Sequence, residues 1–110
     1  MNLRLLTIIG PVLLLAALPV QAQQSGEELV RSSMCYACHQ LDEFSLGPPW
    51  RAIAARHAAR RELMIGVLTS KILYGGGGSW GLVPMVPNQH VDAEQARRMV
   101  EWILSLAPSE

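Results

Sequence analysis

Hydrophobic and polar positions repeat with the period of an α-helix in several stretches between residues 25 and 107. The first stretch opens with Ser25 and, three residues later, Glu28, which is the pattern of a capping box. One helical face behind this cap carries Leu29, Val30, Ser33 and Met34. The pattern predicts a helix that runs directly into Cys35, with Met34 in the core.

Two further helices are expected in the middle of the chain. One spans Trp50 to His57, with Pro49 near its first turn after the break at 47–49. The other runs from about Arg61 to Leu73 and ends at four successive glycines, residues 75–78, which stay helical only at a high entropic cost. Its apolar residues at core spacing are Leu63, Val67, Leu68 and Ile72.

The segment from Ser79 to Val91 is neither helical nor alternating in pattern. Pro84 and Pro87 bracket Met85 there and predict an extended loop of fixed geometry. A last helix is expected from the N-cap Asp92 to the stop at Pro108. Its apolar stripe comprises Ala96, Met99, Val100, Ile103, Leu104 and Ala107. No segment between the helices reads as a strand, so the expected fold class is all-α.

Residues 1–22 differ from the rest, because 15 of them are apolar and Arg4 is their one charged side chain. Arg4, an apolar run over 5–18 and the small-residue pattern at 20–22 before QQSGEE are typical of a secretory signal peptide. A membrane anchor is the alternative, but the run is shorter than the roughly 20 residues of a spanning helix and contains Pro11. The expected organisation is a signal peptide at 1–22 and one periplasmic domain at 23–110, with no membrane segment after cleavage.

Charge and size narrow the function classes for this domain. Removing residues 1–22 takes away Arg4 and leaves eight basic against nine acidic side chains, a net charge of −1. Such a chain lacks the basic excess that binds nucleic acid or anionic lipid. A domain of about 88 residues also buries little core, and it needs a disulfide, a metal or a bound cofactor to be stable.

The motif CYACH, residues 35–39, offers such a cofactor. Two thiols two residues apart can add to the two vinyl groups of one haem, and the histidine after them is placed to bind its iron. This chemistry assigns Cys35 and Cys38 to covalent thioether bonds with one haem c, and His39 to the iron as an axial ligand.

Three other sites use thiols of this kind. A thioredoxin-like dithiol expects a βαβ context, which the helical pattern does not provide. A structural zinc site needs a fourth ligand, for which His57 or His90 would have to move in. A disulfide is compatible with the periplasm, but its small loop removes little chain entropy. Haem attachment is the interpretation that these considerations favour.

The second axial ligand must come from six candidates: Met34, Met64, Met85, Met99, His57 and His90. The pattern assigns Met34, Met64 and Met99 to core packing. It places His57 on a solvated basic face and His90 in a surface loop. Met85 is favoured because its two flanking prolines hold it in an extended loop. A thioether favours ferrous iron and leaves no open coordination position, which points to electron transfer rather than substrate chemistry.

CYACH together with LGPPW and WGLVPMVPN resembles the small bacterial class I monohaem cytochromes c, over essentially the whole chain after residue 22. The resemblance implies an all-α cytochrome c fold with about four short helices around one covalent haem, the first and last helices crossing. It implies a monomeric one-electron carrier, not an enzyme, that docks transiently with periplasmic redox proteins through the haem edge near Cys35 and Cys38. The alternatives are a haem sensor or peroxidase-like enzyme with a displaceable Met85, and a cytochrome subunit of a dehydrogenase or reductase complex.

The resemblance also implies contacts around the haem. The carbonyl of Pro48 accepts the hydrogen bond of His39 Nδ1, and the Asn88 amide lies near the Met85 sulfur. The Trp80 indole reaches a haem propionate, and Lys71 assists it. Simpler roles stay open: a core position for Trp80, a turn cap for Asn88 and a solvated Lys71. The chain departs from the family at Val86, where a second proline is common, and in the glycines before Trp80, and both predict a more mobile loop.

Overall fold

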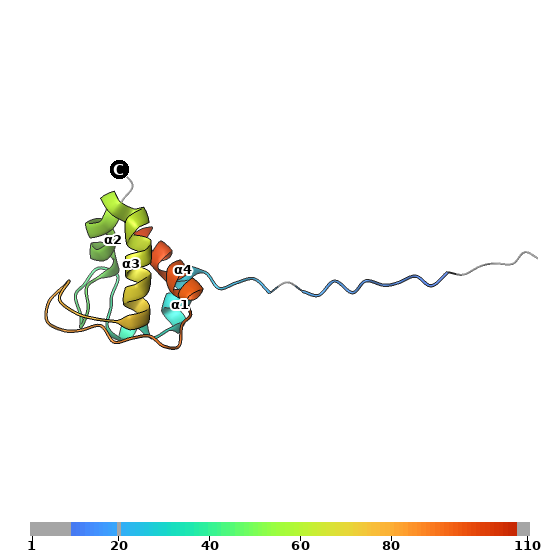
Figure 1. Cartoon of the computed structure of the whole chain (residues 1–110), viewed down its shortest axis with the longest axis horizontal. Helices are drawn as coiled ribbons and strands as arrows, with labels where there is room; N and C mark the ends of the chain where they lie inside the picture. The colour runs from blue at the N-terminus through green and yellow to red at the C-terminus, as the bar shows by residue number, and fades with distance from the viewer. Residues whose placement is uncertain (1–9, 20, 108–110) are drawn as a thin grey trace, which may run out of the picture.

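The computed structural model describes residues 10–19 and 21–107, and four α-helices form its folded part (Figure 1). The helices are α1 Gly26–Ser32, α2 Trp50–His57, α3 Arg61–Tyr74 and α4 Ala93–Leu104. Two 3-10 turns, η1 Cys35–Ala37 and η2 Ala58–Arg60, lie after α1 and after α2. Among the described residues the one β-type pairing is an isolated bridge between Gly76 and Met85, so the all-α prediction is confirmed.

The described N-terminal residues, 10–19 and 21–25, contain no helix and lead away from the folded part (Figure 1). Arg4 and Val20 of the predicted signal peptide, and the predicted helix stop at Pro108, lie outside the described residues. Within the described ranges, no helix has the length and apolar character needed to span a bilayer.

The predicted capping box at Ser25 and the predicted N-cap Asp92 are both present and fix the starts of the first and last helices. The Glu28 N–H donates to Ser25 Oγ at 3.2 Å, and the Ser25 N–H donates to the Glu28 carboxylate at 2.7 Å. Asp92 and Gln95 form the same reciprocal pair at 2.8 and 2.9 Å. These bonds satisfy backbone donors that a helix N-terminus otherwise leaves unpaired.

Helix α4 is the centre of the packing and lies against each of the other three helices. Most of its predicted apolar stripe is buried, namely Ala96, Met99, Val100, Ile103 and Leu104. The helix ends at Leu104, earlier than predicted, so that Ala107 is half-buried and lies beyond it. It crosses α1 at Gly26, where an added methyl group would collide with the Arg98 carbonyl and the Trp102 side chain. The crossing of the first and last helices therefore depends on a residue without a side chain.

The end of α1 differs from the prediction. The helix stops at Ser32, and Met34 adopts the left-handed conformation with φ of 62°. This turn rotates Met34 off the face that buries Leu29 and Val30, and its side chain is 77% exposed. The placement of Met34 in the core is therefore wrong, and the chain reverses before it reaches Cys35.

Helix α3 has the predicted extent, and two of its predicted core residues are confirmed, since Ile72 is buried and Leu68 packs against the core. Ile65 and Ile72 are buried, whereas Leu63 and Val67 are exposed. Apolar residues lie on more than one face of this helix, so spacing alone does not tell which face packs against α4. The prediction that Leu63 and Val67 belong to the core is wrong for this reason.

His57, which the sequence places on a solvated basic face, is buried at the end of α2. Its Nδ1 atom has no hydrogen-bond partner among the described residues. Burial lowers the pKa of His57, and the positive charges of Arg56 and Arg60 lower it further. The fold therefore favours the neutral imidazole.

This burial makes stability depend on pH. Between the lowered pKa and the ordinary value of 6.5, the folded protein binds fewer protons than the unfolded chain. The contribution of the neutral His57 to the free energy of unfolding is therefore complete above pH 6.5. Below that pH the free energy of unfolding falls by at most about 1.4 kcal/mol per pH unit. Denaturant unfolding of the protein at several pH values should show this slope in the wild type and in His90→Gln. It should be reduced in His57→Leu, and an unchanged slope there would contradict the role of His57.

The close crossing of α1 and α4 gives a second expected outcome. Gly26→Ala should destabilise the protein by about 1–3 kcal/mol, because the methyl group forces the two helices apart. Gly66→Ala is the matched control in α3, where no atom lies within 4 Å of an added Cβ, and it should stabilise slightly. Thermal unfolding measures both, with about 4–8 °C per kcal/mol for a domain of this size. Equal midpoints for the two variants would refute the crossing argument.

Candidate functional site

An apolar cavity with about 500 Å³ of empty space, including its open mouth, lies between the helices and the loop that follows α3. Its walls come from α1, α2, α3 and α4, and they are mostly aliphatic. Four residues that the sequence assigns to the site line it together: Cys35, His39, Lys71 and Met85. An apolar wall with few polar groups suits a large flat ring such as haem.

The turn η1 carries Cys35, which lines the cavity, and Cys38 is the residue directly after this turn. The N–H groups of Cys38 and His39 both donate to the Cys35 carbonyl, at 3.2 and 3.0 Å, which winds the motif tightly. Both cysteines are half-buried and free, with no disulfide between them. Burial raises the pKa of the Cys35 thiol, the opposite of what an activated redox dithiol needs.

The imidazole of His39 is held in one orientation by its surroundings. Its Nδ1 lies 2.7 Å from the carbonyl oxygen of Pro48, and a carbonyl only accepts, so Nδ1 carries the proton. The lone pair of Nε2 is therefore free to bind a metal. Gly47 leaves room for the ring, because a Cβ there would lie 2.6 Å from Cε1. The Trp50 ring stacks near the imidazole with centroids 5.9 Å apart.

Met85 reaches the cavity from the Met85 loop, residues 75–87, which begins where α3 ends. Gly75 has φ of 69° and turns the chain out of the helix. Gly76 and Met85 then exchange two backbone hydrogen bonds of 2.9 Å, which bring the thioether back to the core. Met85 is half-buried and packs against the core cluster.

Asn88 fixes the end of this loop on α3. Its backbone N–H and its side-chain Nδ2 donate to the Ile72 carbonyl at 3.1 and 3.0 Å, and Nδ2 also donates to the Val86 carbonyl at 3.2 Å. The amide donors of Asn88 are thus engaged by backbone oxygens on either side of Met85 in the chain. These contacts connect the position of the loop to that of α3.

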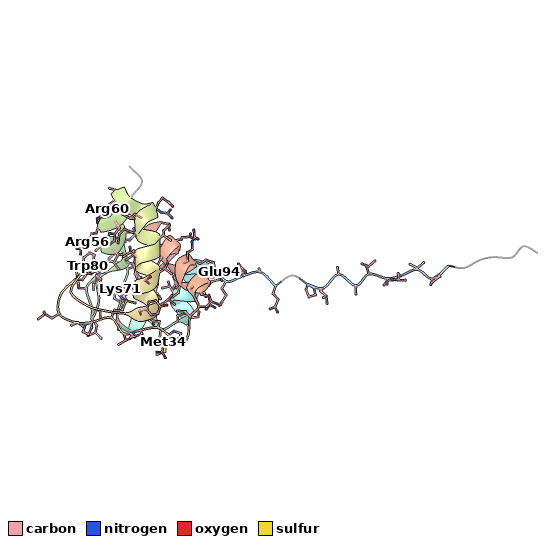
Figure 2. All side chains as sticks on the ribbon, viewed as in Figure 1. Met34, Arg56, Arg60, Lys71, Trp80 and Glu94 are labelled. Carbon is pink, nitrogen blue, oxygen red and sulfur yellow. The ribbon has the colours of Figure 1, made fainter. Side chains whose placement is uncertain are left out.

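Trp80 and Lys71 lie on one side of the molecule, together with Arg56 (Figure 2). Trp80 is half-buried, and the Arg56 guanidinium stacks over its ring at 4.6 Å from the centroid. The Phe44 ring lies on Trp80 with centroids 6.1 Å apart. Lys71 lines the apolar cavity, where a lysine is a suitable partner for a carboxylate, whereas Trp80 is not among the lining residues. Sequence reasoning missed Arg56, because nothing in the pattern of α2 marks its contact with a loop more than twenty residues away.

The described residues do not bring a further ligand to the thiols. Among them there is no group of three His, Cys, Asp or Glu side chains that could hold a metal ion. His57 is buried at the end of α2, and His90 Nε2 lies 3.2 Å from the Ser33 carbonyl. The zinc alternative therefore has no set of four ligands in this arrangement.

Comparisons with known proteins agree on one family. A family model described as Cytochrome c matches residues 23–107. Cytochrome c-551 of Stutzerimonas stutzeri is 41% identical over 92 residues, which cover 84% of this chain and 86% of that protein. Cytochrome c-552 of Hydrogenobacter thermophilus is 39% identical over 82 residues, covering 74% and 82% respectively. The crystal structure of wild-type cytochrome c552 from Nitrosomonas europaea matches with a TM-score of 0.68 at 36% identity, covering 73% of this chain and 98% of that one.

The close approach of Gly47 to the imidazole can be tested directly. Gly47→Ala should push the His39 ring away from Pro48 and weaken the bond from Nδ1, because the new Cβ overlaps the ring. Proton NMR of the reduced haem-bound protein should show the His39 Nδ1–H exchanging faster with solvent. Gly77→Ala is the control, since its added Cβ meets only ordinary contacts of 3.4 Å or more. An unchanged exchange rate in Gly47→Ala would show that the glycine is not needed.

Proposed function

The chain belongs to the cytochrome c family, as a relative of bacterial cytochromes c-551 and c-552, and on this basis we propose that it is a periplasmic one-electron carrier with one covalent haem c. The observation that carries the proposal is the convergence of Cys35, an oriented His39 and Met85 on one apolar cavity. Cys35 and His39 come from one tightly wound motif, whereas Met85 comes from the loop after α3, far along the chain, and no simple packing requirement brings them together.

In this proposal Cys35 and Cys38 form thioether bonds to the haem, and His39 and Met85 are its axial ligands. When bound, the haem supplies an iron that accepts and releases one electron. The Pro48 carbonyl keeps the proton on His39 Nδ1, which fixes the ring and makes Nε2 a stronger donor. The Met85 thioether is a soft, neutral donor, which raises the reduction potential. The aliphatic walls of the cavity exclude water from both ligands.

Three residues act around these ligands in the proposal. Trp80 and Lys71 bind a haem propionate from the side where both lie, and Lys71 also lines the cavity. Asn88 keeps the end of the Met85 loop on α3 through its bonds to Ile72 and Val86. The Asn88 amide thus stabilises the ligand loop through the backbone on both sides of Met85.

The role of a carrier follows from the ligand set rather than from the fold alone. If His39 and Met85 both bound the iron, neither a substrate nor a gas would find a free coordination position. The relatives named cytochrome c-551 and c-552 support an electron carrier and not an enzyme. A sensor or a peroxidase would need Met85 to leave the iron.

Export and partners complete the proposal. The family match begins at residue 23, which is consistent with a signal peptide at 1–22 and a mature periplasmic domain at 23–110. The proposed partners are other periplasmic redox proteins, which dock transiently on a monomer near the thioether edge. Met34, 77% exposed and next to Cys35, supplies apolar surface at that edge. Such small apolar contacts suit short-lived encounters.

The axial assignment predicts the spectrum of one variant. Met85→Ala should abolish the far-red sulfur-to-iron charge-transfer band of the ferric protein, and the reduced protein should bind carbon monoxide. Met34→Leu and Met64→Leu are the controls and should keep the band, as should Met99→Leu at a cost under about 1.5 kcal/mol. A band that survives in Met85→Ala and disappears in one of the controls would move the ligand to another methionine.

The covalent assignment predicts the mass and the folding of a second variant. The wild-type mature chain should gain the mass of one haem, which acidic organic solvent does not extract. Cys35→Ala combined with Cys38→Ala should retain no haem after extraction and should fold poorly, because the cavity then loses the group that fills it. A double variant that is helical and unfolds cooperatively without haem would show that the chain does not need the ring as its core.

A further inference from the structure

We propose that Arg56 is a positioning residue for Met85: its guanidinium clamps the tip of the Met85 loop onto α2 and so keeps the thioether in the cavity. The inference rests on the proposed ligation of iron by Met85. It assigns a function to a side chain that in the proposal neither binds the haem covalently nor contacts its iron.

The Met85 loop has little of its own to hold it in place. Four of its glycines have positive φ: Gly75, Gly76, Gly78 and Gly81, at 69°, 121°, 90° and 122°. Glycine is the residue that loses the most conformational entropy when it is ordered. At the tip Leu82 is fully exposed and Val83 is 62% exposed, so apolar packing contributes little there. Across the tip the backbone makes one hydrogen bond, from the Gly78 N–H to the Gly81 carbonyl at 3.1 Å.

Arg56 makes two contacts with this tip from a helix that is firmly packed. Its Nη1 group donates to the Ser79 carbonyl at 2.7 Å, and its guanidinium carbon lies 4.6 Å from the centroid of the Trp80 ring. Phe44 supports the ring at a centroid distance of 6.1 Å. A charged donor on a backbone carbonyl and a cation on an indole face are each favourable. Only a planar guanidinium makes both contacts at once.

Helix α2 carries Arg56 and holds it in a fixed position relative to the core. Trp50 and Ala54 of α2 are buried, and Trp50 also stacks near the His39 ring. The same helix therefore contacts the imidazole from its first turn and the Met85 loop from its last. Through α2, Arg56 sets the loop relative to His39.

Motion of the tip and release of Met85 are connected through the base of the loop. The two bonds between Gly76 and Met85 close the segment that carries Ser79 and Trp80. When the tip is free, this short bridge is the remaining restraint on the loop between Gly76 and Met85. An added ligand such as imidazole reaches the sixth position only while the loop is open, so its apparent affinity scales with the open fraction.

The experiment measures the open fraction in two independent ways on the haem-bound protein. In Arg56→Met, amide hydrogen exchange at Gly76, Gly78 and Met85 should accelerate by about 5- to 30-fold, the usual effect of losing one or two such contacts. The apparent affinity of the ferric protein for imidazole should rise by the same factor. Arg56→Lys keeps the charge and a donor without the flat face, and it should show a smaller increase in both.

Arg60→Met is the matched control. It removes the same charge one turn further on, and both Arg56 and Arg60 hold down the pKa of His57, so this effect is common to the two variants. Arg60→Met should leave exchange and imidazole affinity unchanged.

Three results would overturn the clamp: unchanged exchange in Arg56→Met, equal increases in Arg60→Met, or faster exchange without a gain in imidazole affinity. A wild type that lacks the charge-transfer band and binds imidazole freely would instead contradict ligation by Met85, and with it the positioning role, whatever the exchange rates.

Discussion

The helices of this chain meet around an apolar cavity, whose lining includes residues of all four helices together with Cys35, His39 and Met85. Protein interiors are normally packed as densely as organic crystals, and side chains around a void lose contact energy. A domain of about 88 residues after residue 22 has little other core to compensate for that loss. The rest of the structure is understandable if a large flat group occupies the cavity, and the thiols of Cys35 and Cys38 provide the means to attach one permanently.

The groups around the cavity are held by backbone contacts more than by charge. Pro48 orients His39 through its carbonyl, Gly47 leaves space for the ring, and the bridge to Gly76 returns Met85 to the core. Helix α2 touches both sides of this arrangement. An electron carrier benefits from such a rigid frame, because a ligand set that does not rearrange costs little reorganisation when the charge on the iron changes.

Local signals in the sequence predicted most of the frame. The capping pairs at Ser25 and Asp92 start helices where expected, α2 has the predicted bounds, and most of the stripe of α4 is buried, because these features depend on neighbouring residues. The predictions that Met34, Leu63 and Val67 are buried were wrong, because burial depends on which face of a helix packs against its neighbours. The prediction that His57 is solvated was wrong for the same reason. Its arginine neighbours suggested an exposed position, whereas the packing of α2 buries it. The contact of Arg56 with Trp80 joins segments that are far apart in the sequence, so the hydrophobic pattern of neither segment could predict it.

The central claim is that Met85 would bind the iron of a haem held in the cavity. The most direct measurement is NMR of the reduced protein with isotope-labelled methionine methyl groups, assigned by comparison with Met85→Leu. The ring current should shift the Met85 methyl signal far upfield of every other methionine methyl. A Met85 methyl at an ordinary position, or an upfield signal that belongs to Met34, Met64 or Met99, would contradict the account.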